Sequence, residues 1–341
     1  MIPSAQRSSL LPVVVLMPLR DDWTSAAELV RRLDEAVSSY PCLLDVVLVD
    51  DGSVQPCNPT DFQSHFRVVR TIQVLRLRRN FGHQRAIAMG LVHLAQTATC
   101  EAVLVMDADG EDTPNGALQL IRAFSEMNHA PSAIFAERGR RTGSFVFRVF
   151  YQVYRIVHFV LTGVSVRVGN FSILPSAYLS TLVVMSEMWN HYVAAFFRSG
   201  LHFTTIPIPR GYRISGTSKM NFVTLAAHGM SAISVFGDVV GVRLLIGSMA
   251  GAVVAALGIL AVASVWLFTD RAILGWATYA AGTLAIILIQ FITVAISFTF
   301  TVLSRRSNLG FVPLRDYALF VADVRNVYRG AEAGVERSAS T

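Results

Sequence analysis

The chain has few cysteines, and they follow no recognisable pattern. Only three of its 341 residues are cysteines, Cys42, Cys57 and Cys100. Their spacing matches neither a metal-ligand motif nor a set of disulfide pairs. The sequence therefore gives no sign of a disulfide scaffold or a zinc site, and it suits a reducing compartment.

Charge is also scarce, and two long stretches have none. Residues 244–269 and 272–304 carry no charged side chain. Each is long enough to cross a hydrocarbon core of about 30 Å as a helix. The hydrophobic fraction of 53% and the mean hydropathy of +0.49 are too high for an ordinary soluble protein. A helical hairpin buried in a large soluble protein is the competing interpretation, but the rest of the chain is too small to bury it.

The few charges around these stretches predict a topology. Only Asp270 and Arg271 separate the two stretches, so the spans should form a hairpin that returns the chain to the side it left. Arg243 precedes the first span, and Arg305 and Arg306 follow the second. Because basic residues accumulate on the cytoplasmic side of membrane proteins, we expect the N-terminal part and the tail in the cytoplasm.

Several function classes lack their motifs. No G-x-G-x-x-G follows the first apolar run and no G-x-x-x-x-G-K occurs, so a dinucleotide fold and a P-loop are not indicated. The net charge of +6 is modest, and the basic residues cluster near the expected membrane. This pattern favours anionic lipid or phosphate groups over nucleic acid. The apolar run at 10–17 is short and lacks a cleavage site, so we expect a first strand rather than a signal peptide.

Strand and helix patterns alternate along the N-terminal two thirds of the chain. Period-two and period-3.6 patterns predict both kinds of element in turn. The expected strands are 11–17, 45–49, 68–75, 103–106, 133–136 and 203–208, and the expected helices are 25–38, 85–95, 146–161 and 222–236. Such alternation predicts an α/β protein with a doubly wound sheet. Helix 146–161 is apolar with sparse basic residues, which suits a helix lying on the membrane or on the sheet.

One strand ends on a cluster of acids. The stretch 103–114 reads VLVMDADGEDTP, and its carboxylates include Asp107, Asp109 and Glu111. Ligands of α/β sheets bind beyond the carboxyl ends of the strands. Alternation would put the three acids on one side if the strand direction persists, and hard oxygen ligands suit Mg²⁺ or Mn²⁺. A calcium-binding EF-hand loop is not indicated, because such a loop has Gly at its sixth position and Glu at its twelfth, and this stretch has neither there. A solvated acidic turn is the other alternative.

Two more polar segments follow strand ends. Asp50 and Asp51 end the second strand and precede a Gly that can adopt positive φ. Arg79, Asn80 and His83 precede an apolar helix, and basic and amide donors at a helix N-terminus suit an anion such as a diphosphate. A solvated basic turn explains the second segment equally well.

Together these motifs resemble a known family. The strings VLVDDGS (47–53), RNFGHQ (79–84) and the D-A-D of 107–109 with T-P at 113–114 are similar to family 2 glycosyltransferases. The resemblance is greatest to the polyisoprenyl-phosphate hexosyltransferases, the group of dolichol-phosphate mannose synthases and bacterial undecaprenyl-phosphate glucosyltransferases. It implies a GT-A-type, Rossmann-like doubly wound sheet with interfacial helices and a C-terminal transmembrane hairpin. It also implies a nucleotide-sugar donor, Mg²⁺ or Mn²⁺, and an acceptor drawn from the bilayer.

The resemblance assigns roles to the acidic motifs. Asp51, together with Asp50, would accept a hydrogen bond from the base of the nucleotide-sugar donor. Asp107 and Asp109 would coordinate the metal that bridges the diphosphate. Glu111 stands where the family usually has Gln, and a carboxylate is a stronger ligand for the same metal. The first strand departs further, because the family's Tyr-Asn-Glu is here Leu-Arg-Asp at 19–21.

Basic and catalytic roles are assigned further along the chain. Arg138, Arg140 and Arg141 match the family's basic loop that meets phosphate, with an exposed basic turn as the alternative. Many relatives carry Gly-Asp-Phe-Arg where this chain has Gly-Asn-Phe-Ser at 169–172, so an acid and a base are lost. Glu187 is the nearest remaining carboxylate to act as a catalytic acid or base. A flexible loop that closes over the phosphates would supply three cations and a hydroxyl from Arg210, Arg213, Ser218 and Lys219.

These observations define an expected enzyme. It transfers one sugar from a nucleotide sugar to a polyisoprenyl phosphate at the cytoplasmic face of a bacterial-type inner (plasma) membrane, and a homo-oligomer is compatible with the sequence. A glycosyltransferase acting on a hydroxyl of a glycolipid or cell-envelope glycan, and a non-catalytic membrane protein that retains the fold, are the alternatives. The expected parts are a cytoplasmic glycosyltransferase domain (1–209), a loop with interfacial helices (210–241), a transmembrane hairpin (242–304, with spans at about 244–268 and 276–302) and a cytoplasmic tail (305–341).

Overall fold

The chain divides into two compact units, each built from segments far apart in the sequence. The structure, a computed structural model, describes residues 10–127, 132–138, 145–164, 168–215, 222–269, 275–307 and 310–330. The sheet unit comprises Met1–Ser144, Val166–Val235 and Phe311–Thr341. The hairpin unit comprises Phe145–Ser165 and Phe236–Gly310.

The described part of the sheet unit contains one eight-stranded sheet and its covering helices. The strands are β1 (Leu11–Leu19), β2 (Cys42–Asp50), β3 (Val69–Leu77), β4 (Ala102–Val105), β5 (Ala133–Arg138), β6 (Val168–Pro175), β7 (Phe203–Ile208) and β8 (Val321–Arg329). The α-helices are α2 (Trp23–Val37), α3 (His83–Thr97), α4 (Pro114–Ser125), α6 (Leu179–Leu182), α7 (Tyr192–Arg198), α8 (Phe222–Ser234) and α11 (Pro313–Phe320). Three short 3₁₀ helices are η1 (Pro59–Phe62), η2 (Ser176–Tyr178) and η3 (Ser186–Trp189).

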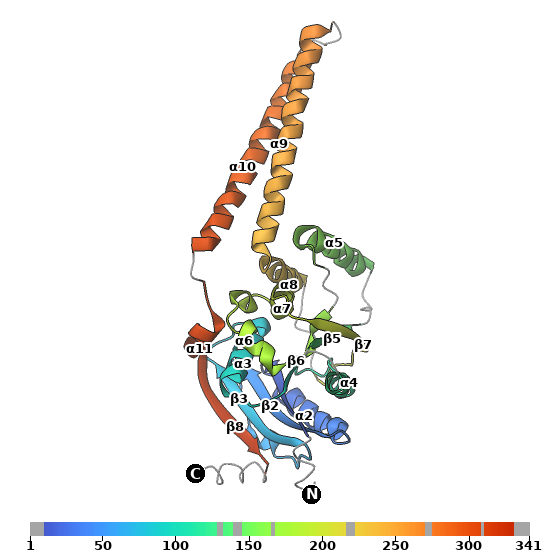
Figure 1. Ribbon diagram of the computed structural model, residues 1–341, viewed down its shortest axis with the longest axis vertical. Coiled ribbons are helices and arrows are strands. Elements are labelled where there is room, and N and C mark those ends of the chain that lie inside the picture. The colour runs from blue at the N-terminus through green and yellow to red at the C-terminus, as the bar shows by residue number, and fades with distance from the viewer. Residues whose placement is uncertain are drawn as a thin grey trace. The chain divides into compact units, whose positions relative to one another are not determined.

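The order of the strands reverses at β1. The sheet runs β7-β5-β6-β4-β1-β2-β3-β8 (Figure 1). β1 pairs in parallel with both β2 and β4, so the chain winds outward from β1 in two opposite directions. In such sheets ligands bind beyond the carboxyl ends of the strands where the order reverses. The ends of β1, β2 and β4 are therefore where a site is expected.

Alternating apolar residues in the central strands build a core on each face of the sheet. In β1, Val13, Val15 and Met17 belong to one core, whereas Val14 and Leu16 belong to the other. α2 and α4 pack on the first face, and α3, α6 and α7 pack on the second. Because side chains of a strand point alternately to opposite faces, a parallel strand covered on both sides reads as a continuous apolar run. The predicted doubly wound α/β fold is confirmed.

The C-terminal segment adds the last strand of the sheet. α11 ends at Phe320 and the chain continues as β8. β8 pairs antiparallel with β3 along the edge of the sheet, with Ile72 opposite Tyr328. Tyr328 packs on the core of the sheet, while α11 packs on α3. A segment that follows the hairpin thus completes the sheet.

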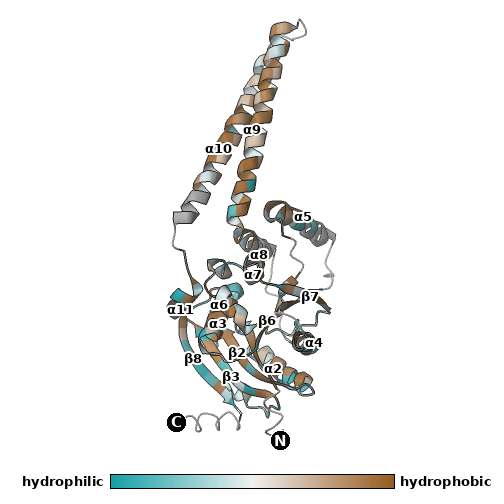
Figure 2. Ribbon diagram, viewed as in Figure 1, coloured by the Kyte–Doolittle hydropathy of each residue, from teal (hydrophilic) through white to brown (hydrophobic). Residues whose placement is uncertain are grey.

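The hairpin unit contains three helices in its described residues: α5 (Phe145–Thr162), α9 (Gly237–Phe268) and α10 (Trp276–Ser307). α9 and α10 pack against each other along their length, and apolar residues predominate on both (Figure 2). A Cβ added at Gly251 would lie 2.5 Å from the ring of Phe291, so the helices approach closely there. Both helices are long and apolar enough to cross a membrane.

Candidate active site

The acidic stretch after β4 is a turn rather than a continued strand. β4 ends at Val105, and α4 begins at Pro114, where the Thr113 hydroxyl caps the helix by accepting from the Gly116 amide. Gly110 has a φ of 89°, and the Glu111 amide donates to Asp109 Oδ1 at 2.9 Å. The strand direction therefore does not persist beyond β4, and local hydrogen bonds turn the chain instead.

The three predicted metal ligands are each partly exposed. Asp107, Asp109 and Glu111 are half-buried, whereas the residues between them are buried. The fourth acid, Asp112, is only 3% exposed, and its Oδ2 accepts from the Asp107 amide at 2.9 Å. Asp112 thus shapes the turn.

A basic loop after β7 lies directly on the acidic turn. The Gly211 amide donates to the Glu111 carbonyl at 2.8 Å, and the Ile214 amide donates to the Asp109 carbonyl at 2.9 Å. A Cβ at Gly211 would lie 2.8 Å from the Gly110 carbonyl oxygen, so the approach requires glycine. Two segments that are 99 residues apart, counted from Glu111 to Arg210, are therefore joined through their backbones.

The side chains of this loop pair with the acids. Arg213 Nη2 lies 2.6 Å from Asp109 Oδ2, and its Nε lies 3.5 Å from Glu111 Oε1 without a hydrogen bond. Arg210 pairs with the other oxygen of Glu111. The structure thus brings together four of the predicted site residues, two acids and two arginines, from two separate motifs.

The second acidic motif holds the RNFGHQ segment. Asp50 and Asp51 are only 3% and 4% exposed. The Phe81 and Gly82 amides donate to the two carboxylate oxygens of Asp51 at 2.6 and 2.8 Å. Burial raises the pKa of Asp51, and these two amides oppose the shift. Asp51 positions the basic segment at the start of α3, and its predicted role towards a nucleobase stays a prediction.

Asp50, Asn80 and Arg79 make contacts within their own segments. Asp50 Oδ1 accepts from the Ser53 amide at 2.8 Å. Asn80 Oδ1 accepts from the Gly82 amide at 3.0 Å, and Gly82 has a φ of 97° just before α3. The guanidinium of Arg79 lies 4.6 Å from the centre of the Phe81 ring. His83 is the first residue of α3, so the structure places the predicted anion-binding residues at a helix N-terminus.

Gln84 connects this segment to Asn170 and to Tyr192, of which the sequence did not single out Tyr192. Its Oε1 accepts from the Tyr192 amide at 2.6 Å, and its Nε2 donates to Asn170 Oδ1 at 3.1 Å. Its Nε2 also lies 2.9 Å from His83 Nε2. His191 was missed as well, and its ring lies 3.2 Å, Nε2 to Nε2, from that of His228 on α8. The only signal was the polar string SEMWNHY at 186–192, which carries no known spacing.

The positions that lost an acid and a base form a neutral buried network. Asn170 and Ser172 are 8% and 0% exposed. The hydroxyls of Ser172 and Tyr192 lie 2.8 Å apart, and burial raises the pKa of Tyr192 so that its phenol stays protonated. β6 pairs with β4 up to Ser172 opposite Val105, which places Asn170 beside the start of the acidic turn. Neutral hydrogen bonds thus replace charge in this part of the sheet.

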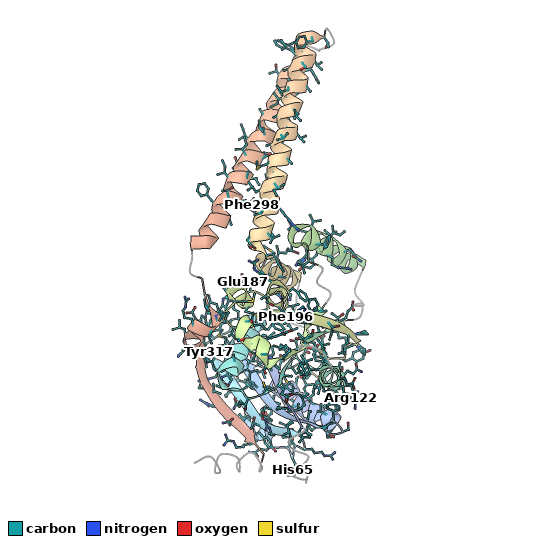
Figure 3. The ribbon with its side chains drawn as sticks, viewed as in Figure 1. His65, Arg122, Glu187, Phe196, Phe298 and Tyr317 are labelled. Atoms are coloured by element: carbon teal, nitrogen blue, oxygen red, sulfur yellow. The ribbon has the colours of Figure 1, made fainter. Side chains whose placement is uncertain are left out.

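Glu187, the predicted acid or base, lies in η3 and is paired with another residue. Its Oε1 lies 3.2 Å from Arg198 Nε, and its Oε2 accepts from the Ser186 hydroxyl at 3.2 Å. Figure 3 shows Glu187 near α7, away from the labelled Arg122 of α4. A carboxylate paired with an arginine in this way suits a structural role as well as it suits a base.

Some predicted residues cannot be placed. Arg138 ends β5, and nothing is described of its side chain. Arg140, Arg141, Ser218 and Lys219 lie outside the described residues.

The donor set of the acidic turn fits a hard divalent cation. Among the described residues, no group of three or more His, Cys, Asp or Glu side chains is arranged to hold a metal ion. Mg²⁺, however, is usually bound through one or two carboxylates together with substrate phosphates. Asp107 and Asp109 supply carboxylates of that kind, and both are partly exposed.

Comparisons with known proteins agree with the motifs. Residues 14–179 match the family model described as glycosyl transferase family 2. The chain is 24% identical over 273 residues to the uncharacterized glycosyltransferase YkcC of Bacillus subtilis, covering 77% of this chain and 80% of that one. It is 24% identical over 223 residues to the undecaprenyl-phosphate 4-deoxy-4-formamido-L-arabinose transferase of Erwinia tasmaniensis, covering 64% and 65%.

A solved structure is similar at lower identity. Mannosyl-3-phosphoglycerate synthase from Rubrobacter xylanophilus superposes with a TM-score of 0.46 and 12% identity, covering 68% of this chain and 74% of that one. The match of the family model spans β1 to the start of α6, and so includes both acidic motifs and the RNFGHQ segment. The chain is therefore a glycosyltransferase, and its residues 14–179 match the family 2 model.

Proposed function

We propose that this enzyme transfers a single sugar from a nucleotide-sugar donor to a polyisoprenyl phosphate, with Mg²⁺ or Mn²⁺, at the cytoplasmic face of the membrane. The observation that carries the proposal is the junction of Asp109 and Glu111 with Arg210 and Arg213 at the end of β4. The Erwinia relative is named as an undecaprenyl-phosphate 4-deoxy-4-formamido-L-arabinose transferase, and this supports the same acceptor class.

The acids and the arginines would interact with the diphosphate in different ways. Asp107 and Asp109 would hold the cation, which when bound neutralises charge on the leaving nucleoside diphosphate. Arg213 is paired with Asp109 and can offer the same guanidinium to a phosphate oxygen, because both are anions of similar geometry. Glu111 orients Arg210 and Arg213 through its two carboxylate oxygens. These contacts stabilise the charge that develops as the donor bond breaks.

The acceptor needs little help from a base. In the reaction the bond from the anomeric carbon to the diphosphate breaks, and a bond to an oxygen of the acceptor phosphate forms. That phosphate is already ionised at pH 7, so no proton has to be removed from it. Asn170 and Ser172 are neutral and buried, and Glu187 is paired with Arg198, so the described residues here favour an acceptor of this kind.

A hydroxyl acceptor is the rival within the same fold. A hydroxyl must lose its proton, and a general base typically contributes about 10² to 10⁴ in rate. Glu187 is the candidate, but it would first have to leave Arg198. The rival therefore requires a rearrangement that the phosphate acceptor does not.

The location follows from the hairpin and its flanking charge. α9 and α10 are candidate membrane spans, and Arg243, Arg305 and Arg306 flank them on the side to which the chain returns. By the positive-inside tendency the sheet unit would lie in the cytoplasm, where nucleotide sugars are made. The acceptor would be drawn from the bilayer.

A direct assay tests the proposal. Purified full-length protein is offered a panel of nucleotide sugars with Mg²⁺ or Mn²⁺ and with undecaprenyl or dolichyl phosphate. We expect one donor to give a glycolipid that is labile to mild acid, as a sugar phosphate diester is. Transfer only to a neutral glycolipid would replace the proposed acceptor with a hydroxyl.

A further inference from the structure

Three histidines from separate segments of the sheet unit lie against one another. They are His83 at the start of α3, His191 at the N-cap of α7 and His228 within α8. The ring centroids of His83 and His228 are 5.3 Å apart, and those of His191 and His228 are 4.6 Å apart. α7 contacts both α3 and α8 (Figure 1). The fold thus gathers imidazoles from distant parts of the chain into one group, which we call the histidine cluster.

Hydrogen bonds at the buried end of the histidine cluster determine which nitrogen atoms carry protons. His191 is 6% exposed, and its Nδ1 accepts from the Ala194 amide at 3.3 Å. A neutral imidazole has one donor and one acceptor nitrogen, so neutral His191 carries its proton on Nε2. That Nε2 lies 3.2 Å from Nε2 of His228, which must then accept. Neutral His228 therefore carries its proton on Nδ1.

Gln84 determines the position of the proton on His83. The side-chain oxygen of Gln84 accepts from the Tyr192 amide, so its Nε2 is a donor. This Nε2 donates to Asn170 Oδ1 at 3.1 Å and lies 2.9 Å from His83 Nε2, which accepts its second hydrogen. His83 therefore has an Nδ1–H, and its side chain is exposed. An Nδ1–H of this kind is a donor whether the imidazole is neutral or protonated.

This arrangement of protons suits an anion rather than a metal ion. A histidine binds a metal through the lone pair of a ring nitrogen. The Nε2 lone pairs of His83 and His228 already accept from Gln84 and His191. Within the described ranges, no group of three or more His, Cys, Asp or Glu side chains is arranged to hold a metal ion. Two adjacent rings with Nδ1–H groups can instead donate to the oxygens of one phosphate.

The histidine cluster connects the acidic turn to the helix that precedes the hairpin. On one side, Gln84 joins it to Asn170, which lies beside the start of the acidic turn. On the other side, His228 belongs to α8, and α9 begins only three residues after α8 ends. A lipid acceptor must bring its phosphate to the donor at the acidic turn while its chain stays in the bilayer. The histidine cluster therefore lies where such a phosphate is needed.

We propose that His83 and His228 bind the phosphate of the polyisoprenyl-phosphate acceptor. This rests on the proposed function. The diphosphate of the donor is assigned to the acidic turn and Arg213, so the two phosphate groups have separate sites. The imidazole N–H groups orient the acceptor so that one phosphate oxygen attacks the anomeric carbon as the bond from that carbon to the diphosphate breaks. The nucleoside diphosphate leaves, and no proton is transferred.

Two variants of His83 in the full-length protein separate a phosphate contact from packing. His83→Leu removes the donor, whereas His83→Asn keeps an amide N–H near the position of Nδ1. We expect the KM for undecaprenyl phosphate to rise about fivefold in His83→Leu and about twofold at most in His83→Asn, the range of one neutral hydrogen bond. The KM for the nucleotide sugar should stay the same, which also shows that the variants fold. His228→Leu should behave like His83→Leu.

His65→Leu is the matched control, because His65 is another exposed histidine of the sheet unit. It should have the KM values of the wild type. An unchanged KM for undecaprenyl phosphate in both His83→Leu and His228→Leu would overturn the proposal. A rise in the KM for the nucleotide sugar instead would assign the histidine cluster to the donor and overturn it as well.

Chemical modification tests binding without turnover. Diethyl pyrocarbonate modifies accessible imidazoles, and mass spectrometry of peptides reports on each histidine. We expect saturating undecaprenyl phosphate to lower the modification of His83 by roughly threefold. The modification of His65 and His202, which are exposed elsewhere in the sheet unit, should not change. Undecaprenol, which lacks the phosphate, and uridine or guanosine diphosphate with Mn²⁺ should leave His83 unprotected.

The probes distinguish the acceptor phosphate from the other parts of the substrates. Protection of His83 by undecaprenol as strong as that by undecaprenyl phosphate would overturn the phosphate contact. Protection by a nucleoside diphosphate alone would place the donor there and overturn the proposal too. A wild-type enzyme that transfers to no polyisoprenyl phosphate would reject the proposed function. Transfer to undecaprenyl phosphate without protection of His83 would reject the histidine site alone.

Discussion

At the scale of single residues, the acidic turn and the basic loop neutralise each other before any substrate is present. Arg213 contacts both Asp109 and Glu111, and Arg210 contacts Glu111. Partners in such a network do not act independently, so removing one charge changes the position of the others. The effect of a substitution at this site should therefore be measured on donor binding as well as on turnover.

The first residue-scale prediction concerns Asp109. Asp109→Ala should abolish transfer, because a diphosphate left without its cation faces the remaining carboxylates. Titration calorimetry with the nucleoside diphosphate should show weaker binding in the presence of Mn²⁺ and little change in its absence. Asp61→Ala, at an exposed acid in η1, is the matched control and should behave as wild type. Unchanged turnover in Asp109→Ala would rule out the metal role.

The second residue-scale prediction separates the two acceptors. Arg213→Ala should lower turnover with a polyisoprenyl phosphate by about 10² or more, since charge-assisted contacts to phosphate are lost, whereas Glu187→Gln should keep most activity. Lys219→Ala should behave like Arg213→Ala. Steady-state kinetics with a lipid phosphate and with a neutral glycolipid provide the measurement. A Glu187→Gln protein that folds, binds donor and is inactive would mean that the acceptor is a hydroxyl.

At the scale of elements, the sequence predicted the strands and motifs that a local pattern defines. It missed the elements and contacts that are defined by partners far away in the sequence. The strands 11–17 and 45–49 were found because both faces of β1 and β2 are buried, and the acids that follow them mark their ends. β6 was missed because its Gly-Asn-Phe-Ser start resembles a loop, and pairing with β4 makes it a strand. The acids of 107–111 could be named from sequence. Their contact with Arg210 and Arg213 could not, because it depends on how β7 directs the following loop.

An element-scale prediction concerns the attachment of the C-terminal segment to the sheet. Buried His93 of α3 lies 3.0 Å, Nδ1 to hydroxyl, from Tyr317 of α11 and 3.3 Å, Nε2 to Oε1, from Gln73 of β3. Figure 3 labels Tyr317 beside α11. Burial lowers the pKa of His93, and burial raises the pKa of Tyr317 to about 12. Both side chains are therefore neutral at pH 7, as their contact requires.

The sign of the pH effect follows from that lowered pKa. The unfolded chain takes up a proton on this histidine near its usual pKa of about 6.5, whereas the folded protein resists it. The contribution to stability is fully present above about pH 6.5 and is lost as the pH falls towards the folded pKa, by at most about 1.4 kcal/mol per pH unit. Thermal unfolding of the full chain in detergent should show a smaller difference between pH 7.5 and 5.5 in His93→Gln than in wild type. Equal pH dependence in the two proteins would contradict this assignment.

At the scale of the whole molecule, the chain leaves the sheet unit for the hairpin unit twice and returns each time. The sheet unit takes its last strand, β8, from sequence that follows the hairpin, so the fold of the catalytic domain cannot be finished until α10 has been made. If α9 and α10 cross the membrane, both ends of the hairpin must lie on the same side, because β3 and β8 pair with each other. The sheet therefore requires both ends of the hairpin on one side of the membrane, independently of the flanking charges.

The last prediction tests that topology. Fusions after Thr269 place a reporter at the connection between α9 and α10, and fusions after Arg306 place it at the end of α10. Alkaline phosphatase, which is active only outside the cytoplasm, should be active after Thr269 and inactive after Arg306, and a green fluorescent reporter should give the opposite pattern. Neutralising Arg243, Arg305 and Arg306 should weaken the orientation bias if flanking charge alone sets it. The pairing of β3 with β8 requires both ends of the hairpin on one side, whichever side that is, so a weakened bias should invert the hairpin as a whole rather than leave its ends on opposite sides. Alkaline phosphatase activity after Arg306 in the unaltered chain would overturn the predicted orientation, and activity after both Thr269 and Arg306 would overturn the hairpin.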